Sequence, residues 1–207
     1  MPYPVMVLRA MVIIVALAAL FFRADCAFLT NTCRVGQVFS YFTIHSTILF
    51  TLTLAVSLWY RGREGEWLTA ARALAASYLV VSGVTFGTML LNADLVGHVF
   101  LVSLSSKVMH FVLPVYAVLD LLFVPGGRRL RWKTGWMSLI FPLIWSSYIL
   151  TAGRISGWYP YFFLDPQQVG GYRAVAVYSS VVAALTLVSS FTLVGLNRLS
   201  SPRTSLP

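Results

Sequence analysis

Charged residues are scarce in this sequence: Asp, Glu, Lys and Arg make up only 10% of the 207 residues. A soluble domain usually carries about 25%. The rest of the chain is strongly apolar, with 58% hydrophobic residues and a mean hydropathy of +0.81. This shortage of charge excludes a water-soluble globular domain. We therefore expect an integral membrane protein whose length suits one compact helical bundle.

Acidic residues are especially few, so the formal net charge is +9. The basic residues stand in short clusters between apolar runs, such as GGRRLRWK at 126–133, and not on one soluble face. Such clusters flank membrane spans and meet lipid headgroups, so we expect membrane lipids as partners and no nucleic acid. Lysine is much rarer than arginine, while Ala and Val are abundant. This composition is typical of a high-GC bacterial genome, so we expect a multi-pass protein of the bacterial plasma membrane.

Histidine is also rare, with three residues in the whole chain. Three histidines are few for a multi-haem electron carrier, and no soft-ligand motif lies inside the apolar runs. Asp94 lies four residues before His98, and this spacing leaves a haem or metal protein as a minor alternative. The main expectation is no metal and no cofactor. A transporter is disfavoured because the sequence shows neither paired midplane charges nor an inverted repeat.

The two cysteines, Cys26 and Cys33, lie in the first loop between apolar runs. A disulfide would close a small loop if that side of the membrane is oxidising. Two free thiols are equally compatible with the spacing, so the sequence leaves both states open.

Six apolar runs are long enough to cross a bilayer, which takes about 17–25 helical residues. They cover about residues 5–22, 38–60, 69–91, 95–124, 136–152 and 174–196, and the fourth begins somewhere between Leu95 and Lys107. The first is expected to be a retained helix, because Ala24-Asp25-Cys26 is a poor signal-peptide cleavage site. With no internal repeat, we predict a single all-α polytopic domain of six transmembrane helices over residues 1–207. The tail at 198–207 is expected to be disordered.

The distribution of basic residues predicts the orientation. If the N-terminus is cytoplasmic, five of the 15 Lys and Arg residues fall outside and the other ten inside. The five outside are Arg23, Arg34, Lys107, Arg154 and Arg173. The positive-inside rule then places both termini in the cytoplasm. Near the inner side, we expect Arg9 to extend to the interface and Asp120 to pair with Arg128 or Arg129.

Two polar residues inside the apolar runs are expected at the same depth. Thr43 precedes Arg61 by 18 residues, and His110 precedes Arg128 by 18 residues. Both runs cross from outside to inside, so each residue lies about 27 Å from the cytoplasmic charges at 1.5 Å per residue. Ionisable groups at this depth are costly and are candidates for function. Thr43 and His110 would form one site if their helices are neighbours.

Helical phase separates the polar residues around Thr43. Ser46 and Thr47 share its face by the i, i+3, i+4 spacing, whereas His45 points about 200° away. We expect Ser46 and Thr47 to line a cavity with Asn92 and Lys107. Ser and Thr are also common packing residues in membrane helices, where they bond to the helix backbone.

The fourth span and the last loop carry two further features. Pro114 removes the donor that would bond the carbonyl of His110, so we expect a kink at the histidine with its carbonyl left free. The loop GWYPYFFLDPQQVGGY at 157–172 is rich in Pro, Gly and aromatic residues. It would be either a lid over an outward-facing pocket or an interfacial turn anchored by its rings.

The order of three short motifs resembles a known family. They are Phe42-Thr43, then MHFVLPVYAVLDLLF with its histidine at 110, then WYPYFFLD before the last span. This pattern, over about residues 5–196, resembles the androgen-induced and androgen-dependent integral-membrane proteins and their bacterial relatives. Animal members are intramembrane threonine hydrolases that cleave fatty acid esters of hydroxy fatty acids. The resemblance implies a nucleophile at Thr43 and a base at His110.

A hydrolase of this kind needs a base to take the threonine proton and donors to hold the oxyanion. Ser46, Asn92 and Lys107 are the candidate donors, and the sequence does not choose among them. Asp120 is ten residues from His110, about 15 Å along a helix, and is too distant to orient it. The alternative is a noncatalytic membrane protein, regulatory or lipid-binding, in which the same polar residues only pack helices.

Overall fold

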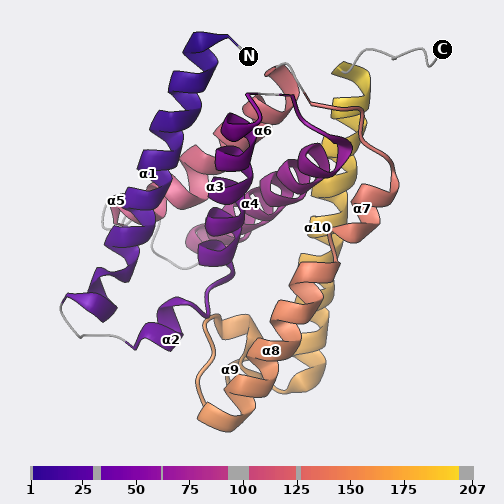
Figure 1. Cartoon of the computed structure of the whole chain (residues 1–207). Helices are drawn as coiled ribbons and strands as arrows, with labels where there is room; N and C mark the ends of the chain where they lie inside the picture. Colours follow the sequence, from indigo (N-terminus) through magenta and orange to yellow (C-terminus); the bar gives the residue numbers. More distant parts are fainter. Residues whose placement is uncertain (1, 30–33, 62, 93–102, 125–126, 201–207) are drawn as a thin grey trace.

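The computed structural model describes residues 2–29, 34–61, 63–92, 103–124 and 127–200. These residues form helices and no strand, which confirms the predicted all-α class. Six helical segments are long and apolar enough to cross a membrane, as predicted, so the chain has the architecture of a multi-pass membrane protein. The helices lie in one bundle (Figure 1).

The observed helices match the six predicted spans with shifted ends. The six spanning segments are α1 (Tyr3–Phe28), α3 (Phe42–Trp59), α4 (Glu66–Asn92), α5–η2–α6 (Leu104–Lys107, Val108–Val112, Leu113–Phe123), α7–α8 (Lys133–Met137, Ile140–Ser156) and α10 (Tyr172–Ser200). Three short helices lie in the connections: α2 (Val35–Val38), η3 (Phe162–Leu164) and α9 (Pro166–Val169). The predicted start of the fourth span, 95–102, lies outside the described residues.

The start of α1 and the end of α10 lie at the same end of the bundle (Figure 1). An even number of spans requires this arrangement. The bundle therefore agrees with two termini on one side of the membrane, and the assignment of that side to the cytoplasm stays a prediction from the basic residues.

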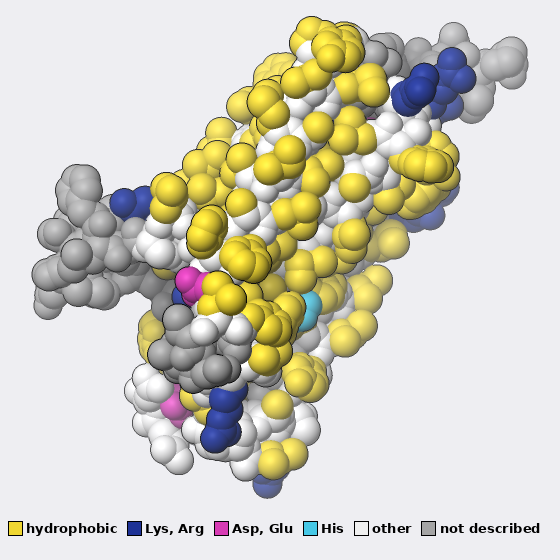
Figure 2. Space-filling model, turned by 60° about the vertical axis from the view of Figure 1, so that its left-hand side comes forward, with side chains coloured by type: hydrophobic (Ala, Val, Ile, Leu, Met, Phe, Trp, Pro, Cys, Tyr) yellow, Lys and Arg dark blue, Asp and Glu magenta, His cyan; other side chains and the backbone are white. Residues whose placement is uncertain are grey.

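Helix α4 forms the centre of the bundle, in contact with α3, α6 and α10. Small side chains such as Ala73, Ala75 and Ala76 are almost fully buried and let these helices approach closely. The outer helices turn large apolar side chains outward. Hydrophobic side chains cover most of the face shown in Figure 2, with Lys and Arg mainly toward its ends. This apolar surface suits contact with lipid chains.

Four charged side chains are buried together near the end of the bundle where α1 begins. Arg9 donates to both carboxylate oxygens of Asp120, at 2.8 and 3.1 Å. Arg72 donates to Glu64 at 2.6 Å and also to Asp120. Arg9 reaches Glu64 at 3.4 Å and bonds to Ser57. Two cations and two anions thus balance in a network whose four charged members are at most 3% exposed.

This network corrects two expectations. Asp120 binds Arg9 and Arg72, not Arg128 or Arg129, and Arg9 is fully buried and does not extend to the interface. These partners are brought together by the packing of helices that are distant in the sequence. Helix α4 packs directly against α6, and α1 reaches the same end of the bundle, so their arginines meet the Asp120 carboxylate inside the protein.

Candidate active site

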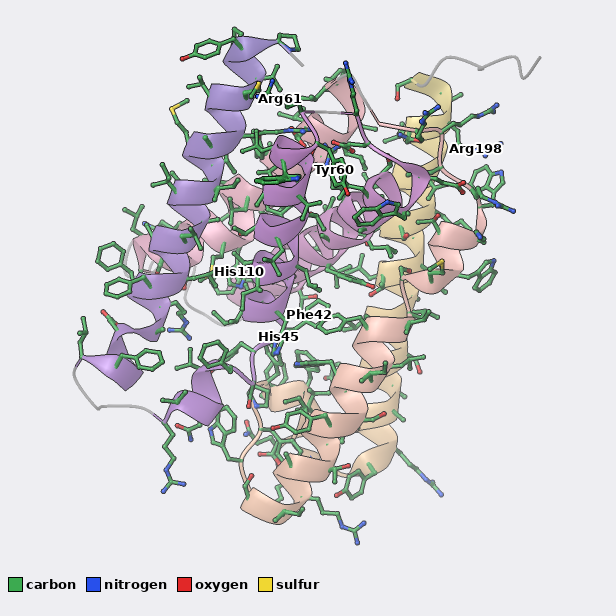
Figure 3. The ribbon with its side chains drawn as sticks, viewed as in Figure 1. Phe42, His45, Tyr60, Arg61, His110 and Arg198 are labelled. Atoms are coloured by element: carbon green, nitrogen blue, oxygen red, sulfur yellow. The ribbon has the colours of Figure 1, made fainter. Side chains whose placement is uncertain are left out.

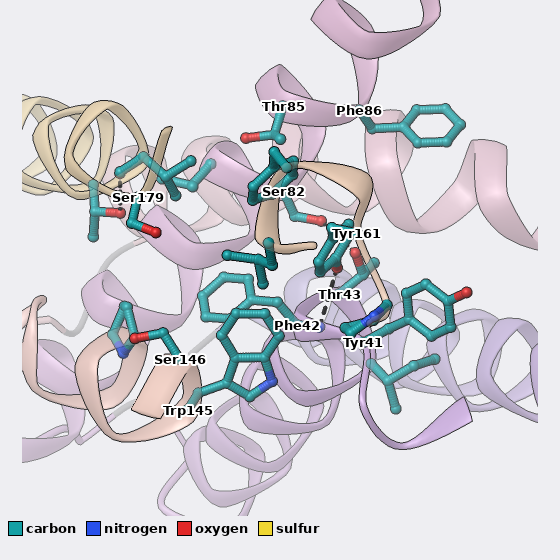
Figure 4. Close-up of a pocket in the computed structure, with 18 of the residues that line it drawn as sticks. Tyr41, Phe42, Thr43, Ser82, Thr85, Phe86, Trp145, Ser146, Tyr161 and Ser179 are labelled. Carbon is teal, nitrogen blue, oxygen red and sulfur yellow. Dashed lines mark hydrogen bonds between the residues drawn. The ribbon is translucent and has the colours of Figure 1, made fainter. Parts of the chain in front are cut away.

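An apolar cavity of about 290 Å³ has Phe42 and His110 in its wall. Phe42 starts α3, whereas Tyr60 and Arg61 lie at the other end of this helix (Figure 3), which is the end that carries Ser57 of the ionic network. The cavity walls come from the first turn of α3, from α4, η2, α8 and α10, and from the loop after α8. The polar residues on its wall include Thr43, Ser82, His110 and Tyr161. In Figure 4, Thr43, Ser82 and Tyr161 point toward one another at the edge of this cavity.

Thr43 and His110 meet at this cavity. Thr43 is the second residue of α3, and His110 lies in the π-helical turn η2. The Thr43 Oγ1 is 3.2 Å from the His110 Nε2, so the prediction of equal depth is confirmed. Thr43 is 5% exposed, which places its hydroxyl inside the protein and next to the cavity.

The hydrogen bonds around His110 determine which nitrogen can act as a base. His110 Nδ1 lies 3.0 Å from the backbone carbonyl oxygen of Ser106, which can only accept. In the neutral imidazole Nδ1 therefore carries the proton and Nε2 is the acceptor. The Thr43 hydroxyl donates to Nε2, and its oxygen accepts from the Ser82 hydroxyl at 2.6 Å. The Phe86 ring packs on the imidazole with the centroids 4.0 Å apart.

The backbone at His110 is a π-helical turn, Val108–Val112, which ends two residues before Pro114. The N–H of Leu113 donates to the carbonyl of Val108, five residues back. Such single π-turns are frequent at functional sites, and here the turn accommodates the proline expected to kink the helix. The His110 carbonyl lies against Gly83 of α4: a Cβ built on Gly83 would stand 2.4 Å from that oxygen.

Gly83 therefore sets the position of the His110 backbone. Gly83→Ala is expected to displace η2 and to lower any activity that depends on the Thr43–His110 contact by tenfold or more, at a stability cost of about 1–3 kcal/mol for overpacking. The matched control is Gly87→Ala, one turn further along α4, where an added Cβ meets nothing within 4 Å. Labelling by an active-site probe and thermal unfolding would measure both variants. Equal labelling of the two variants would contradict this role of Gly83.

Tyr161 joins the last loop to the first turn of α3. The backbone N–H of Phe42 donates to the Tyr161 hydroxyl at 3.1 Å, which satisfies one of the free donors at the start of this helix. The same hydroxyl also interacts with Thr43. Burial raises the pKa of Tyr161 to about 12, so the phenol keeps its proton at neutral pH. Tyr161 was not singled out from the sequence, although its aromatic-rich loop was.

The loop at 157–172 forms part of the cavity wall through Pro160, Tyr161, Phe163 and Leu164. Its aromatic rings pack on one another and on α8, with Tyr161 stacked on Phe163 at 5.2 Å and 6.0 Å from Trp145. Asp165 in this loop caps the short helix α9 by accepting from the N–H of Gln167 at 2.9 Å. The loop thus contributes one side of the cavity wall.

Other predicted site residues lie elsewhere. Ser46 donates to the Phe42 carbonyl at 2.7 Å, and the buried Thr47 Oγ1 has no hydrogen-bond partner among the described residues. Neither residue lines the cavity, and neither does Lys107, which is half-buried on α5. Ser46 and Thr47 on α3 therefore serve helix packing, because the Ser46 hydroxyl bonds back to its own helix and Thr47 is fully buried.

His45 belongs to another surface, as its helical phase predicted. Its Nδ1 donates to the Tyr41 carbonyl at 3.1 Å, and its ring packs near Phe141. The side chains of Asn92 and Cys26, and the whole of Cys33, lie outside the described residues. Asp94 and His98, the basis of the metal alternative, lie outside them as well.

Two polar atoms on the cavity wall are buried and unpaired. Trp145 Nε1 on α8 and Ser179 Oγ on α10 have no hydrogen-bond partner among the described residues. Buried polar atoms are normally paired, and neither of these two atoms is exposed to the cavity, so a small movement of its side chain would be needed before it could bind a ligand. Trp145 Nε1 is a donor only, and it needs an acceptor such as a carbonyl oxygen.

Comparisons with known proteins give no family: no protein-family model, curated protein or solved structure matches the chain. The function is therefore argued from the geometry. A buried hydroxyl contacts a base whose second nitrogen is held by a carbonyl, and both groups face an apolar cavity with unpaired polar atoms on its wall.

Proposed function

We propose that the protein is an integral-membrane hydrolase of lipid esters, of the fatty acid ester of hydroxy fatty acid type, with Thr43 as nucleophile and His110 as base. The site would lie near the outer face of the membrane. The observation that carries the proposal is the 3.2 Å contact between Thr43 Oγ1 and His110 Nε2, in an imidazole whose Nδ1 is already bound by the Ser106 carbonyl. This is the arrangement of an activated nucleophile: hydroxyl, base, and a group that orients the base.

In the first half of the reaction, Thr43 Oγ1 attacks the ester carbonyl carbon while its proton moves to His110 Nε2. The tetrahedral intermediate collapses when Nε2–H protonates the leaving alkoxide, which releases the alcohol and leaves an acyl-threonine. In the second half, Nε2 takes a proton from water, and the hydroxide attacks the acyl carbon. The fatty acid leaves, and the proton returns to Thr43 Oγ1.

The oxyanion needs donors that face the cavity. Two groups on residues of the cavity wall are candidates: the Tyr161 hydroxyl, which keeps its proton and interacts with Thr43, and Trp145 Nε1, which has no hydrogen-bond partner among the described residues. Both residues line the cavity, and their rings are 6.0 Å apart. Of the candidates taken from the sequence, Ser46 donates to backbone carbonyls and Lys107 lies off the cavity wall. Tyr161 and Trp145 are therefore the preferred donors.

The surroundings of the dyad suit a lipid substrate. Most of the cavity wall is apolar, which favours hydrocarbon chains over polar esters. A second apolar groove between α4 and α6 also contains His110 in its wall, together with Val84, Val115 and Leu119, which expose 42–61% of their surface. An ester dissolved in the bilayer has a route to the histidine along this groove.

A noncatalytic lipid-binding role is the second candidate. One observation favours it: the Thr43 hydroxyl is buried and bonded to both Ser82 and His110, as a packing residue would be. The two candidates differ in whether Thr43 reacts, and a covalent probe can therefore distinguish them.

The test is labelling of the detergent-solubilised protein with an alkyl fluorophosphonate, followed by mass spectrometry of the labelled peptide. We expect covalent attachment at Thr43 and complete loss of labelling in Thr43→Ala. The matched control is Thr47→Ala, which removes a buried threonine one turn along α3 that does not line the cavity. It should label like the unmodified protein. Labelling that survives Thr43→Ala would exclude Thr43 as the nucleophile.

A further inference from the structure

The cavity wall carries one permanent charge. Among the described residues that line the cavity, Arg23 is the only Lys or Arg, and none is Asp or Glu. Arg23 lies near the end of α1, and its guanidinium carbon stands 5.3 Å from the centre of the Tyr41 ring. This cation–π contact helps to hold the guanidinium at the cavity.

Arg23 is close to the Thr43–His110 pair. Tyr41, the ring beneath the guanidinium, is the N-cap residue of α3 and stands two positions before Thr43. Arg23 and His110 both line the cavity. Charges interact more strongly beside an apolar cavity than in water, so an anion bound there would gain more than at an exposed arginine.

We propose that Arg23 binds the carboxylate of a lipid, one hydrocarbon chain of which lies in the cavity. Arg presents a planar fork of donors that fits a carboxylate with two parallel hydrogen bonds. The cavity volume of about 290 Å³ is near the lower limit of typical ligand sites, which suits one hydrocarbon chain, and the second chain of an ester would lie in the groove between α4 and α6. Arg23 would then select, among esters, those that carry a free carboxylate.

The selectivity among esters rests on the proposed hydrolase function, whereas the binding of a lipid carboxylate does not. Binding is therefore measured first, in the Thr43→Ala protein, which removes the proposed nucleophile and keeps every other residue of the cavity wall. The ligands are radiolabelled oleate and oleyl alcohol, which share a chain and differ in the charged group. The protein is kept in nonionic detergent at neutral pH.

We expect oleate to bind at least about tenfold more tightly than oleyl alcohol, because only oleate offers a charged partner to the guanidinium, and hydrogen bonds between charged groups are the stronger ones. Arg23→Gln should remove this preference and leave the affinity for oleyl alcohol unchanged. The matched control is Arg154→Gln, which removes an exposed charge at the end of α8 without touching the cavity wall. It should retain the preference.

Three results would overturn the proposal. They are an oleate preference that persists in Arg23→Gln, an equal loss for oleate and oleyl alcohol, and displacement of oleate by dioleoyl phosphatidylglycerol with the same dependence on Arg23. The third would indicate a phospholipid headgroup site. Folding is measured separately, by thermal unfolding in the same detergent, which Arg23→Gln should leave unchanged.

The kinetic experiment addresses substrate selection. For an ester with a free carboxylate and its methyl-capped analogue, Arg23→Gln should lower kcat/KM about tenfold for the free acid only. If Thr43 fails to label but oleate binding still depends on Arg23, the hydrolase proposal is wrong and the carboxylate site stands. If Thr43 labels and Arg23→Gln changes neither binding nor selectivity, the hydrolase proposal stands and the carboxylate site is wrong.

Discussion

Hydrolysis of a long-chain lipid ester is expected to fall by about 10²–10⁴-fold when His110 is replaced by alanine, the usual contribution of a positioned general base. The physical reason is the Thr43 hydroxyl, which donates to His110 Nε2 in the tautomer that the Ser106 carbonyl selects. The loss should appear in kcat, with KM little changed, because the imidazole acts on the proton and not on the hydrocarbon chain. Steady-state rates in nonionic detergent would measure both constants.

The control for this variant is His45→Ala. His45 lies on the same helix as Thr43, but its ring packs near Phe141 and does not line the cavity. It should keep the rate of the unmodified protein. Equal losses in the two histidine variants would show that His110 acts through general stability, and a His110→Ala variant with full activity would remove the base from the proposed mechanism.

The prediction of equal depth for Thr43 and His110 came from the sequence because helical rise is fixed by the backbone. Counting residues from Arg61 and Arg128 places two parallel spans on one scale. Helical rise does not predict whether the two helices are neighbours, because this depends on how the helices pack together. The contact at 3.2 Å shows that α3 and η2 are neighbours, and no feature of the spacing required this.

Helical phase was less reliable for side-chain contacts. Ser46 shares a face with Thr43, yet its hydroxyl turns back to the carbonyl of Phe42, which is an option open to any serine in a helix. Ser82 and Tyr161 come from α4 and from a loop, and both reach Thr43 through tertiary packing. Sequence patterns identify polar residues inside the membrane, but the packing decides which of them bond to one another.

The partner of Asp120 illustrates the same limit. The basic cluster at 126–133 is near in sequence, but the carboxylate binds Arg9, which is 111 residues away, and Arg72. Burying these charges is expensive, and their mutual attraction offsets the cost only while all four are present. The network is therefore the part of the bundle where one substitution should have the largest effect on stability.

Asp120→Asn is expected to lower the free energy of unfolding by about 3–5 kcal/mol, the usual result of removing one partner from a buried ion pair. The substitution keeps the shape of the side chain but leaves two arginines facing Glu64 alone. The control is Glu66→Gln, which breaks the exposed pair with Arg131 at 3.6 Å, where both side chains are more than half exposed. Exposed pairs contribute about 0–1 kcal/mol. Unfolding curves in detergent would measure both variants.

A second variant separates the loss of charge balance from the loss of packing. Replacing Arg9 by Met together with Asp120→Asn restores a one-to-one balance between Arg72 and Glu64, which remain in contact at 2.6 Å. We expect this double variant to recover part of the stability lost in Asp120→Asn. Because Asp120 lies about 15 Å along the helix from His110, the folded fraction of each variant should still label at Thr43. Equal stability of Asp120→Asn and Glu66→Gln would show instead that water or lipid headgroups screen the network.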